Sequence, residues 1–195
     1  MDDLDGLVDA ARAGGDWAFA RLWQELSPAV AGYLRARGVA EADDVTSEVF
    51  LAAFQGITTF DGNGARFRSW LFTIAHHRGV DSLRRQTRLV REVEYAEDDD
   101  QRTVSSAEDT AMINVRAAET RALLSRLTPE QREVVVLRFV ADLSLEEVAE
   151  ITGRRLGAVK QLQRRGIAGL RRHLDGLISP MPVPSGPVDS ITESR

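Results

Sequence analysis

The stretch from Leu143 to Leu174 predicts a short helix, a glycine turn and a second helix, and it constrains the fold more than any other part of the chain. Ser144 stands three residues before Glu147, which is the spacing of a capping box at a helix N-terminus. We therefore expect the first helix to run from about Leu145 to Thr152. Gly153 follows it, and glycine often ends a helix in the left-handed conformation.

The second helix of this stretch is expected to start near Leu156 and to have two chemically different faces. At about 100° per residue, apolar side chains fall on one arc and polar, mostly basic ones fall on the other. The apolar arc consists of Leu156, Val159, Leu162, Ile167, Leu170 and Leu174, and the basic arc of Lys160, Gln161, Arg164, Arg165, Arg171 and Arg172. One face is therefore expected to pack against protein and the other to meet an anion.

The basic side chains of this helix are concentrated rather than spread over the protein. Between Arg154 and His173 the sequence has six Arg, one Lys and no acidic residue, a local charge of +7 in a chain of net charge −5. A helix fits the major groove of DNA, where its first turns read base edges and the arginines beyond them hold phosphates. A solvated helix on a bundle surface is the alternative, but its polar face usually mixes acids with bases. The pattern favours DNA binding.

The composition indicates an all-helical protein, because 43% of the 195 residues are hydrophobic and strand-like patterns are few. The chain has no Cys and three His, which removes disulfides, thiol catalysis and Cys-type zinc sites. This composition suits a reducing compartment, with the cytoplasm as the default. The longest apolar run, Val134 to Leu137, is too short to span a bilayer, and the acidic start is unlike a signal peptide. We therefore expect no membrane insertion.

No catalytic or metal-binding arrangement is recognisable in the sequence. The adjacent His76 and His77 would lie about 100° apart on a helix, which is a poor geometry for two ligands of one metal ion. A Gly-rich phosphate loop and a nucleophile motif are both absent. We expect a protein that has no cofactor, no metal ion and no enzymatic activity.

The N-terminal region is expected to begin with two helices separated by a pair of glycines. Asp16 is expected to cap the second helix, whose apolar positions recur at helical spacing and include Trp17 and Trp23. These rings are expected in the core. Pro28 is expected to break or restart the helix, because proline lacks the backbone N–H.

The next helix, expected from about Glu41 to Phe54, begins with several acidic residues. Acid at a helix N-terminus complements the helix dipole, and this structural role is one explanation for them. Asp44 and Glu48, however, are four residues apart and therefore lie on one face. They form a negative patch that is suited to a basic partner helix.

The residues from Ile57 to Arg66 are expected to form a polar loop, because Asp-Gly-Asn-Gly supplies turn residues and a helical period is absent. A helix from Phe67 to Arg91 follows. From Arg66 to Arg91 the sequence has seven Arg and one Asp, a local charge of +6. Rings such as Trp70 and Phe72 beside arginines suggest single-stranded nucleic acid, whose bases stack on rings while its backbone follows the charge. Each ring alone is better explained as core, so this interpretation depends on the arginines and the loop.

The charge inverts from Glu92 to Asp109, where eight acidic residues and one Arg give −7. This composition predicts a flexible acidic linker, which either screens the basic regions or is a solvated tether without such a role. A helix is expected from about Thr110 to Arg126, and the sequence TPEQ from Thr128 is a strong start signal for another. The Pro-rich tail after Ile178 is expected to be disordered.

Two pairs of motifs carry a resemblance to a known family. DDVTSEVFLAAF followed by FRSWLFTIAHHRGVDSLRR resembles region 2 of the extracytoplasmic-function sigma factors, and LTPEQREVVVLRFVADLSLEEVAEITG followed by AVKQLQRRG resembles their region 4. The resemblance covers nearly all of Ala18 to Leu174. It implies two small helical domains, region 2 over residues 1–91 and a region 4 with a helix-turn-helix over 107–178. A linker over 92–106 joins them, and a tail covers 179–195.

The resemblance also implies roles for individual residues. The acidic helix would dock on the clamp coiled coil of the polymerase's largest subunit through Asp43, Asp44, Ser47 and Glu48. The loop and the helix after it would capture flipped bases of the melted minus-10 element through Phe60, Asn63, Arg66, Trp70, His77, Arg78, Arg84 and Arg85. The last helix would read the minus-35 element as duplex through Arg154, Arg155, Lys160, Gln161, Arg164 and Arg165. His77 stands where the family commonly has a base-pocket Asn.

The main interpretation is a specificity subunit that binds core RNA polymerase and promoter DNA, both duplex and melted. The resemblance also implies an anti-sigma factor as a partner. Two alternatives remain open, a stand-alone helix-turn-helix regulator and an adaptor whose basic helix binds an acidic protein. A regulator needs a ligand pocket or a dimer seam in its N-terminal half, whereas this half has an acidic helix and an aromatic, arginine-rich helix.

Overall fold

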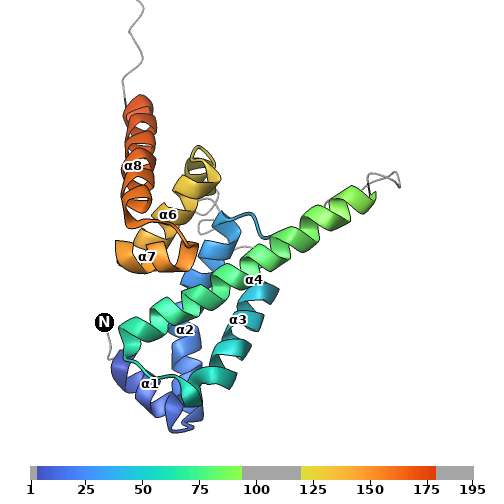
Figure 1. The fold of residues 1–195 in the computed structure, drawn as a ribbon, viewed down its shortest axis with the longest axis vertical. Coiled ribbons are helices and arrows are strands. Elements are labelled where there is room, and N and C mark those ends of the chain that lie inside the picture. Colours follow the sequence, from blue (N-terminus) through green and yellow to red (C-terminus); the bar gives the residue numbers. More distant parts are fainter. Residues whose placement is uncertain (1–3, 94–119, 179–195) are drawn as a thin grey trace, which may run out of the picture.

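The computed structural model describes residues 4–93 and 120–178, and within these ranges every regular element is a helix (Figure 1). Residues 120–124 form the end of one helix. The other helices are α1 (Leu4–Arg12), α2 (Asp16–Ala36), α3 (Ala42–Gly56), the 3-10 turn η1 (Ile57–Thr59), α4 (Gly64–Val93), α6 (Pro129–Phe139), α7 (Leu145–Thr152) and α8 (Leu156–Ile178). The predicted all-α fold is confirmed. The expected linker beyond Val93, most of the helix expected over 110–126 and the Pro-rich tail lie outside the described residues.

Helix α2 runs without interruption through Pro28, so the predicted break is wrong. A proline inside a helix removes one backbone hydrogen bond and crowds the carbonyl four residues before it. Leu26 and Val30, on either side of Pro28, are both buried in the hydrophobic core. Packing on both sides of the proline holds the helix together and offsets the lost bond.

The start of α2 also differs from the prediction. Gly15 occupies the N-cap position, and Asp16 is the first helical residue and makes no side-chain cap. Its charge complements the helix dipole from the first turn instead. Trp17 is 62% exposed and Trp23 is 38% exposed, so the expectation that both lie in the core is wrong. Helical spacing identifies an apolar face, but it does not show where that face reaches the edge of the bundle.

The connection between α3 and α4 is shorter than predicted. The turn η1 continues directly from α3, and α4 already begins at Gly64, so the expected loop from Ile57 to Arg66 is wrong at both ends. Asn63 explains the early start of α4. Its side-chain oxygen accepts a hydrogen bond from the backbone N–H of Arg66 at 3.0 Å, as an N-cap residue does.

The helix boundaries in the C-terminal half follow the predicted signals closely. Thr128 and Ser144 both form complete capping boxes, with Gln131 and Glu147 respectively. Gly153 ends α7 in the left-handed conformation, with φ of 64°. Helix α8 begins three residues later, as expected. These ends depend on contacts within four residues of sequence, which is why the sequence alone could locate them.

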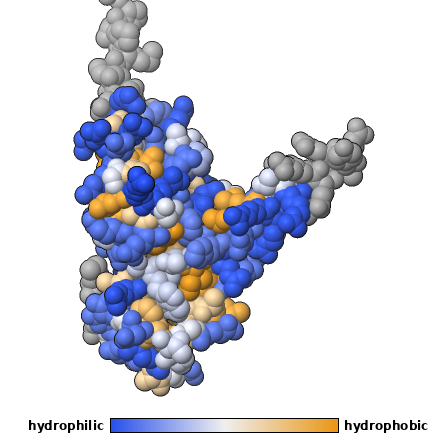
Figure 2. Space-filling model, viewed as in Figure 1, coloured by the Kyte–Doolittle hydropathy of each residue, from blue (hydrophilic) through white to orange (hydrophobic). Residues whose placement is uncertain are grey.

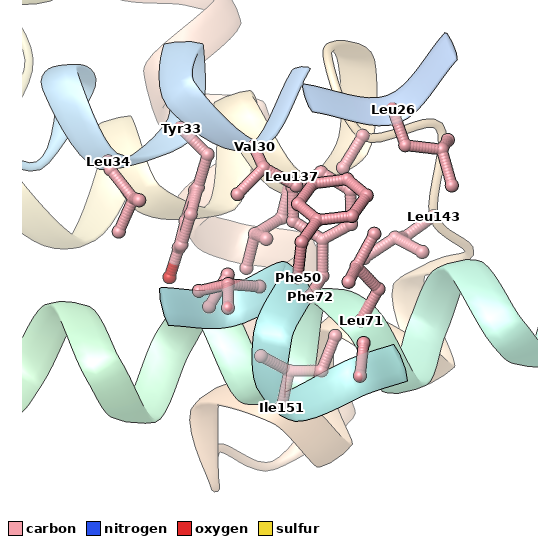
Figure 3. Packing of buried hydrophobic residues seen from close by; sticks show 14 of the residues in the cluster. Leu26, Val30, Tyr33, Leu34, Phe50, Leu71, Phe72, Leu137, Leu143 and Ile151 are labelled. Atoms are coloured by element: carbon pink, nitrogen blue, oxygen red, sulfur yellow. The ribbon is translucent and has the colours of Figure 1, made fainter. Parts of the chain in front are cut away.

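The two halves of the described chain pack against each other around one continuous core. Figure 1 shows α6 and α7 lying against α2 and α4, while the second half of α4 projects away from the bundle. The close-up in Figure 3 shows side chains from both halves in one cluster, among them Phe50, Leu71, Phe72, Leu137, Leu143 and Ile151. Val140, the C-cap residue of α6, is 48% exposed and lies outside this core.

The close packing of α8 on α6 leads to a first prediction. A Cβ atom added at Gly166 would lie 2.8 Å from Cγ2 of Val135, whereas one added at Gly157 would meet nothing within 4 Å. Gly166→Ala should therefore lower the free energy of unfolding by about 1–3 kcal/mol through overpacking. The control, Gly157→Ala, should leave it unchanged or raise it by up to about 1 kcal/mol, because alanine favours helix. Urea unfolding followed by circular dichroism measures both, and equal effects would contradict this packing.

Candidate nucleic-acid interface

Helix α8 separates apolar from basic side chains, as its sequence predicts. Val159 is fully buried and Leu162 is half-buried, whereas Leu174 at the far end is 43% exposed. The exposed residues of the basic face are Arg155, Lys160, Gln161, Arg164, Arg165, Arg171 and Arg172. None of their cations forms an ion pair with an acid in the described part of the chain. This face is therefore available to an anionic partner.

Arg154 lies differently from the other basic residues of this region. It is half-buried in the turn before α8, and its Nε atom is buried without a hydrogen-bond partner. Its positive charge is close enough to help lower the pKa of Glu133 in α6. Arg154 is thus partly directed toward the protein, although the sequence places it with the DNA-facing group.

The second basic face lies on α4. His77, Arg78, Arg84 and Arg85 are all exposed. Arg84 forms an ion pair of 3.7 Å with Asp81, and both side chains are mostly in solvent, so this pair is weak. Figure 2 shows that the projecting half of α4 is mainly hydrophilic on the visible side. The sequence-predicted residues of this helix are therefore brought together on a solvent-facing surface.

An aromatic cluster lies at the start of α4. The rings of Phe60 and Trp70 stack with centroids 5.0 Å apart and planes at 22°, and both side chains are half-buried. Phe67, fully buried, meets both rings edge-on. The two outer rings therefore combine a packed side with an accessible side. The sequence left core and nucleic-acid contact as alternatives for such rings, and their half-burial is compatible with both.

The loop beside this cluster is held in place by α1. Arg12 donates a hydrogen bond of 2.9 Å to the carbonyl oxygen of Gly62, and Asp5 accepts one of 2.6 Å from the backbone N–H of Gly64. Asn63 and Arg66 are both exposed in this loop and at the start of α4. The Asn63 oxygen is used as the helix cap, so the amide nitrogen of this side chain is the group left to face solvent.

The acidic face of α3 contains Asp43, Asp44, Ser47 and Glu48. Asp43 pairs with Arg35 of α2, and Glu48 lies 3.7 Å from Arg78 of α4. The hydroxyl of Ser47 donates to the backbone carbonyl of Asp43 at 3.1 Å. Asp44 is exposed and forms no ion pair with a described residue. Glu48 and Arg78, expected to bind different partners, therefore contact each other.

One buried polar cluster was not anticipated from the sequence. Glu133 of α6, only 7% exposed, meets Tyr33 of α2, Arg37 at the C-cap of α2 and His76 of α4. The only sequence signal is an acid immediately before the apolar run Val134 to Leu137. The partners of this acid lie far away along the chain and could not be identified from spacing.

Residues 4–93 and 120–178 contain no group of three or more His, Cys, Asp or Glu placed to hold a metal ion. In the same ranges, no helix is both long enough and apolar enough to cross a membrane.

The fold and its two basic helices define a two-part helical nucleic-acid-binding protein, and comparison with known families specifies it further. The family described as Sigma-70 region 2 matches residues 22–89, and the family described as Sigma-70, region 4 matches residues 123–172. These ranges contain α3 and α4 in the first case and the helix-turn-helix in the second. The chain belongs to the sigma-70 family of RNA polymerase sigma factors.

Curated relatives place the chain in the extracytoplasmic-function (ECF) group of that family. It is 39% identical over 171 residues to the ECF RNA polymerase sigma factor BldN of Streptomyces coelicolor, a match that covers 86% of this chain and 64% of that protein. It is 34% identical over 177 residues to the ECF RNA polymerase sigma factor SigD of Mycobacterium tuberculosis, covering 86% and 82% of the two chains.

Solved structures of similar fold are sigma factors as well. CnrH in complex with the cytosolic domain of CnrY has a TM-score of 0.60 and 27% identity, and the match covers 89% of this chain and 99% of that one. RpoE of Bartonella quintana, in complex with the anti-sigma factor NepR, has a TM-score of 0.60 at 20% identity and supports the fold alone. It covers 80% of this chain and 96% of that one.

Proposed function

We propose that this chain binds core RNA polymerase and directs it to promoters by recognising a minus-10 and a minus-35 element. The observation that carries this proposal is the presence of two exposed basic faces, on α4 and on α8, within matches to both sigma regions. In this assignment residues 1–91 form region 2, residues 92–106 the linker and residues 107–178 region 4. The chain acts as an initiation factor in the cytoplasm, without a catalytic turnover of its own.

Region 4 reads the minus-35 element as duplex. Helix α8 enters the major groove with its exposed cations, and the assigned contacts are Arg154, Arg155, Lys160, Gln161, Arg164 and Arg165. The capping box at Ser144 and the left-handed Gly153 support this role, because they fix the start and the end of α7, the first helix of the helix-turn-helix.

Region 2 binds the melted minus-10 element. Bases of a single strand stack on aromatic rings, and the phosphates follow neighbouring cations. The assigned contacts are Phe60, Asn63, Arg66, Trp70, His77, Arg78, Arg84 and Arg85. The accessible sides of Phe60 and Trp70, beside a loop that α1 holds in place, support a base-binding site at the start of α4.

Core polymerase docks on the acidic face of α3, through Asp43, Asp44, Ser47 and Glu48. A basic coiled coil would meet the exposed charge of Asp44 directly and would exchange the weak Glu48–Arg78 pair for its own contacts. This exchange would also free Arg78 for DNA. An anti-sigma factor is a further partner in this proposal, supported by the solved complex of the sigma factor RpoE, which has a similar fold, with the anti-sigma factor NepR.

Run-off transcription with purified core polymerase on a promoter library tests the function directly. The chain should make core polymerase initiate from a limited set of promoters, and omission of the chain should abolish these transcripts. Tight sequence-specific DNA binding without any effect on polymerase would favour a stand-alone regulator instead.

His77→Asn is expected to change the preferred base at one minus-10 position while assembly with polymerase is unaffected. His77 is exposed and makes an edge-on ring contact with His76 at 5.7 Å between centroids, so the stability change should stay within about 0.5 kcal/mol. Promoter-library transcription and thermal melting measure the two effects. His173→Asn, the same change near the end of α8, should leave the minus-10 preference unaltered. A large loss of stability together with unchanged base preference would show that His77 has a structural role.

A further inference from the structure

The buried cluster between α6 and the N-terminal helices contains an acid that is held almost entirely by the other half of the chain. One carboxylate oxygen of Glu133 lies 2.8 Å from Nη1 of Arg37, 3.1 Å from Nδ1 of His76 and 3.4 Å from the hydroxyl of Tyr33. Tyr33 belongs to α2, Arg37 is the C-cap residue that follows α2, and His76 belongs to α4. A region 4 acid therefore occupies a polar site made by region 2.

Glu133 is ionised and Tyr33 is neutral in this cluster. Burial alone would raise the pKa of Glu133, but the hydrogen bond from His76 and the positive charges of Arg37, His76 and Arg154 lower it below its ordinary value. Burial also raises the pKa of Tyr33, so its phenol stays protonated and donates to the carboxylate. Glu133 is thus an anion bound by an arginine and a hydroxyl, which are groups that also bind phosphate oxygens in DNA complexes.

Arg37 belongs to a second feature as well. It lines a groove of about 470 Å³ together with residues of α4, and its described lining residues are Arg37, Val80, Leu83, Arg84, Thr87 and Arg88. Arg84 of this groove is among the proposed minus-10 contacts. The groove therefore joins the Glu133 site to the basic face of α4, and its described lining includes the arginines Arg37, Arg84 and Arg88.

Other contacts hold α6 over this end of region 2. Nη1 of Arg132 donates to the backbone carbonyl of Ala36 at 3.2 Å, directly beside Arg37. Arg68 of α4 lies 3.4 Å from Asp142, which follows α6. While these contacts last, Arg37 is only 15% exposed and its charge is used within the protein.

From this geometry we infer that Glu133 occupies the site where Arg37 binds a phosphate of promoter DNA once the two halves of the chain separate. In the closed chain, the Glu133 carboxylate takes the place of a phosphate of the DNA backbone. It therefore keeps Arg37 of region 2 unavailable to DNA. The inference rests on the proposed function, because it needs region 2 to bind DNA along α4. It assigns Arg37 as a backbone-contacting residue and Glu133 as the group that masks it.

Binding of the polymerase-free chain to a fluorescent DNA duplex with a single-stranded extension, measured over a range of salt concentrations, tests the inference. Glu133→Gln should bind more tightly than the parent chain, and the slope of log K against log[salt] should steepen by about 0.7–0.9, the value of one added phosphate contact on single-stranded or duplex DNA. Glu133→Gln with Arg37→Gln should lose both the tighter binding and the steeper salt slope. Glu133→Gln with Arg37→Lys should keep them, because lysine retains the positive charge. Glu146→Gln, which removes an exposed acid from α7, should behave as the parent chain does.

An unchanged salt slope in Glu133→Gln would overturn the inference, and so would a gain that survives Arg37→Gln. Thermal melting of each variant identifies a folding defect, and if Arg37→Gln unfolds, the salt slope of Glu133→Gln compared with that of Glu146→Gln decides the inference. Run-off transcription separates this result from a failure of the proposed function. If the parent chain supports promoter-directed transcription and the salt slope of Glu133→Gln equals that of the parent, only the masking by Glu133 is overturned.

Discussion

Asp44→Arg combined with Glu48→Arg is expected to abolish binding to core polymerase while the helical fold is retained. Asp44 is exposed and has no ion-pair partner in the described chain, and the Glu48–Arg78 pair of 3.7 Å is about half exposed on both sides. Such a surface pair contributes only about 0–1 kcal/mol to stability. An arginine near the N-terminus of α3 opposes the helix dipole by about 0.3–1 kcal/mol. A like-charge contact with a basic partner costs several kcal/mol of binding free energy, which is the larger effect.

Glu146→Arg with Glu150→Arg is a matched control for this variant. It reverses two exposed acids that are likewise four residues apart, but on α7. The total change in charge is the same, so a general electrostatic effect on polymerase binding would appear in both variants. Co-purification with core polymerase and run-off transcription measure the outcome. The docking assignment would be wrong if the α3 variant bound and transcribed as the parent does, or if the α7 variant failed equally.

Arg164→Ala with Arg165→Ala is expected to remove about two units from the salt dependence of promoter binding by the polymerase complex. Both side chains are exposed on the basic face of α8 and have no described acidic partner. Each phosphate contact contributes about 0.9 to the slope of log K against log[salt], so the loss of two contacts also weakens binding at low salt. Promoters that depend on a minus-35 element should lose transcription most strongly.

Arg171→Ala with Arg172→Ala removes two arginines from the same face of the same helix, seven residues further along. Seven residues are close to two turns, so these side chains are displaced by about 10 Å along the axis and point in nearly the same direction. They lie beyond the assigned minus-35 contacts, and we expect a slope change well below that of the first pair. Filter binding at several salt concentrations measures both variants. Equal losses would show that α8 attracts DNA through its general charge and that its position in the groove is not as assigned.

The parts of the fold that the sequence could predict are those that local contacts determine. The capping boxes at Thr128 and Ser144, the left-handed glycine that ends α7 and the two faces of α8 all involve residues within about one helical turn of each other. The exposed basic side chains could be predicted for the same reason, because a charged residue opposite an apolar arc has solvent as its default surroundings. The proposed contact residues on α8, apart from Arg154, lie on the exposed face that this pattern indicates.

Other features were decided by packing between segments that are distant in sequence. Pro28 should end a helix by its local chemistry, yet buried Leu26 and Val30 keep α2 continuous on the bundle. Trp17 follows the apolar spacing but lies at the edge of the bundle and is mostly exposed. In both cases the outcome depends on neighbouring helices, which a local pattern does not specify.

The Glu133 cluster shows the same distinction at the candidate site. Tyr33 and Glu133 are 100 residues apart, and the sequence between them includes the acidic segment outside the described structure. Periodicity predicts that Glu133 lies beside apolar residues, but a buried acid is tolerated only where specific cations and donors reach it. The sequence by itself determined the helices, their ends and the positions of the two basic faces. Only the tertiary structure decided that α6 would bring its one buried acid to Arg37, because that contact depends on how two separately predictable halves pack together.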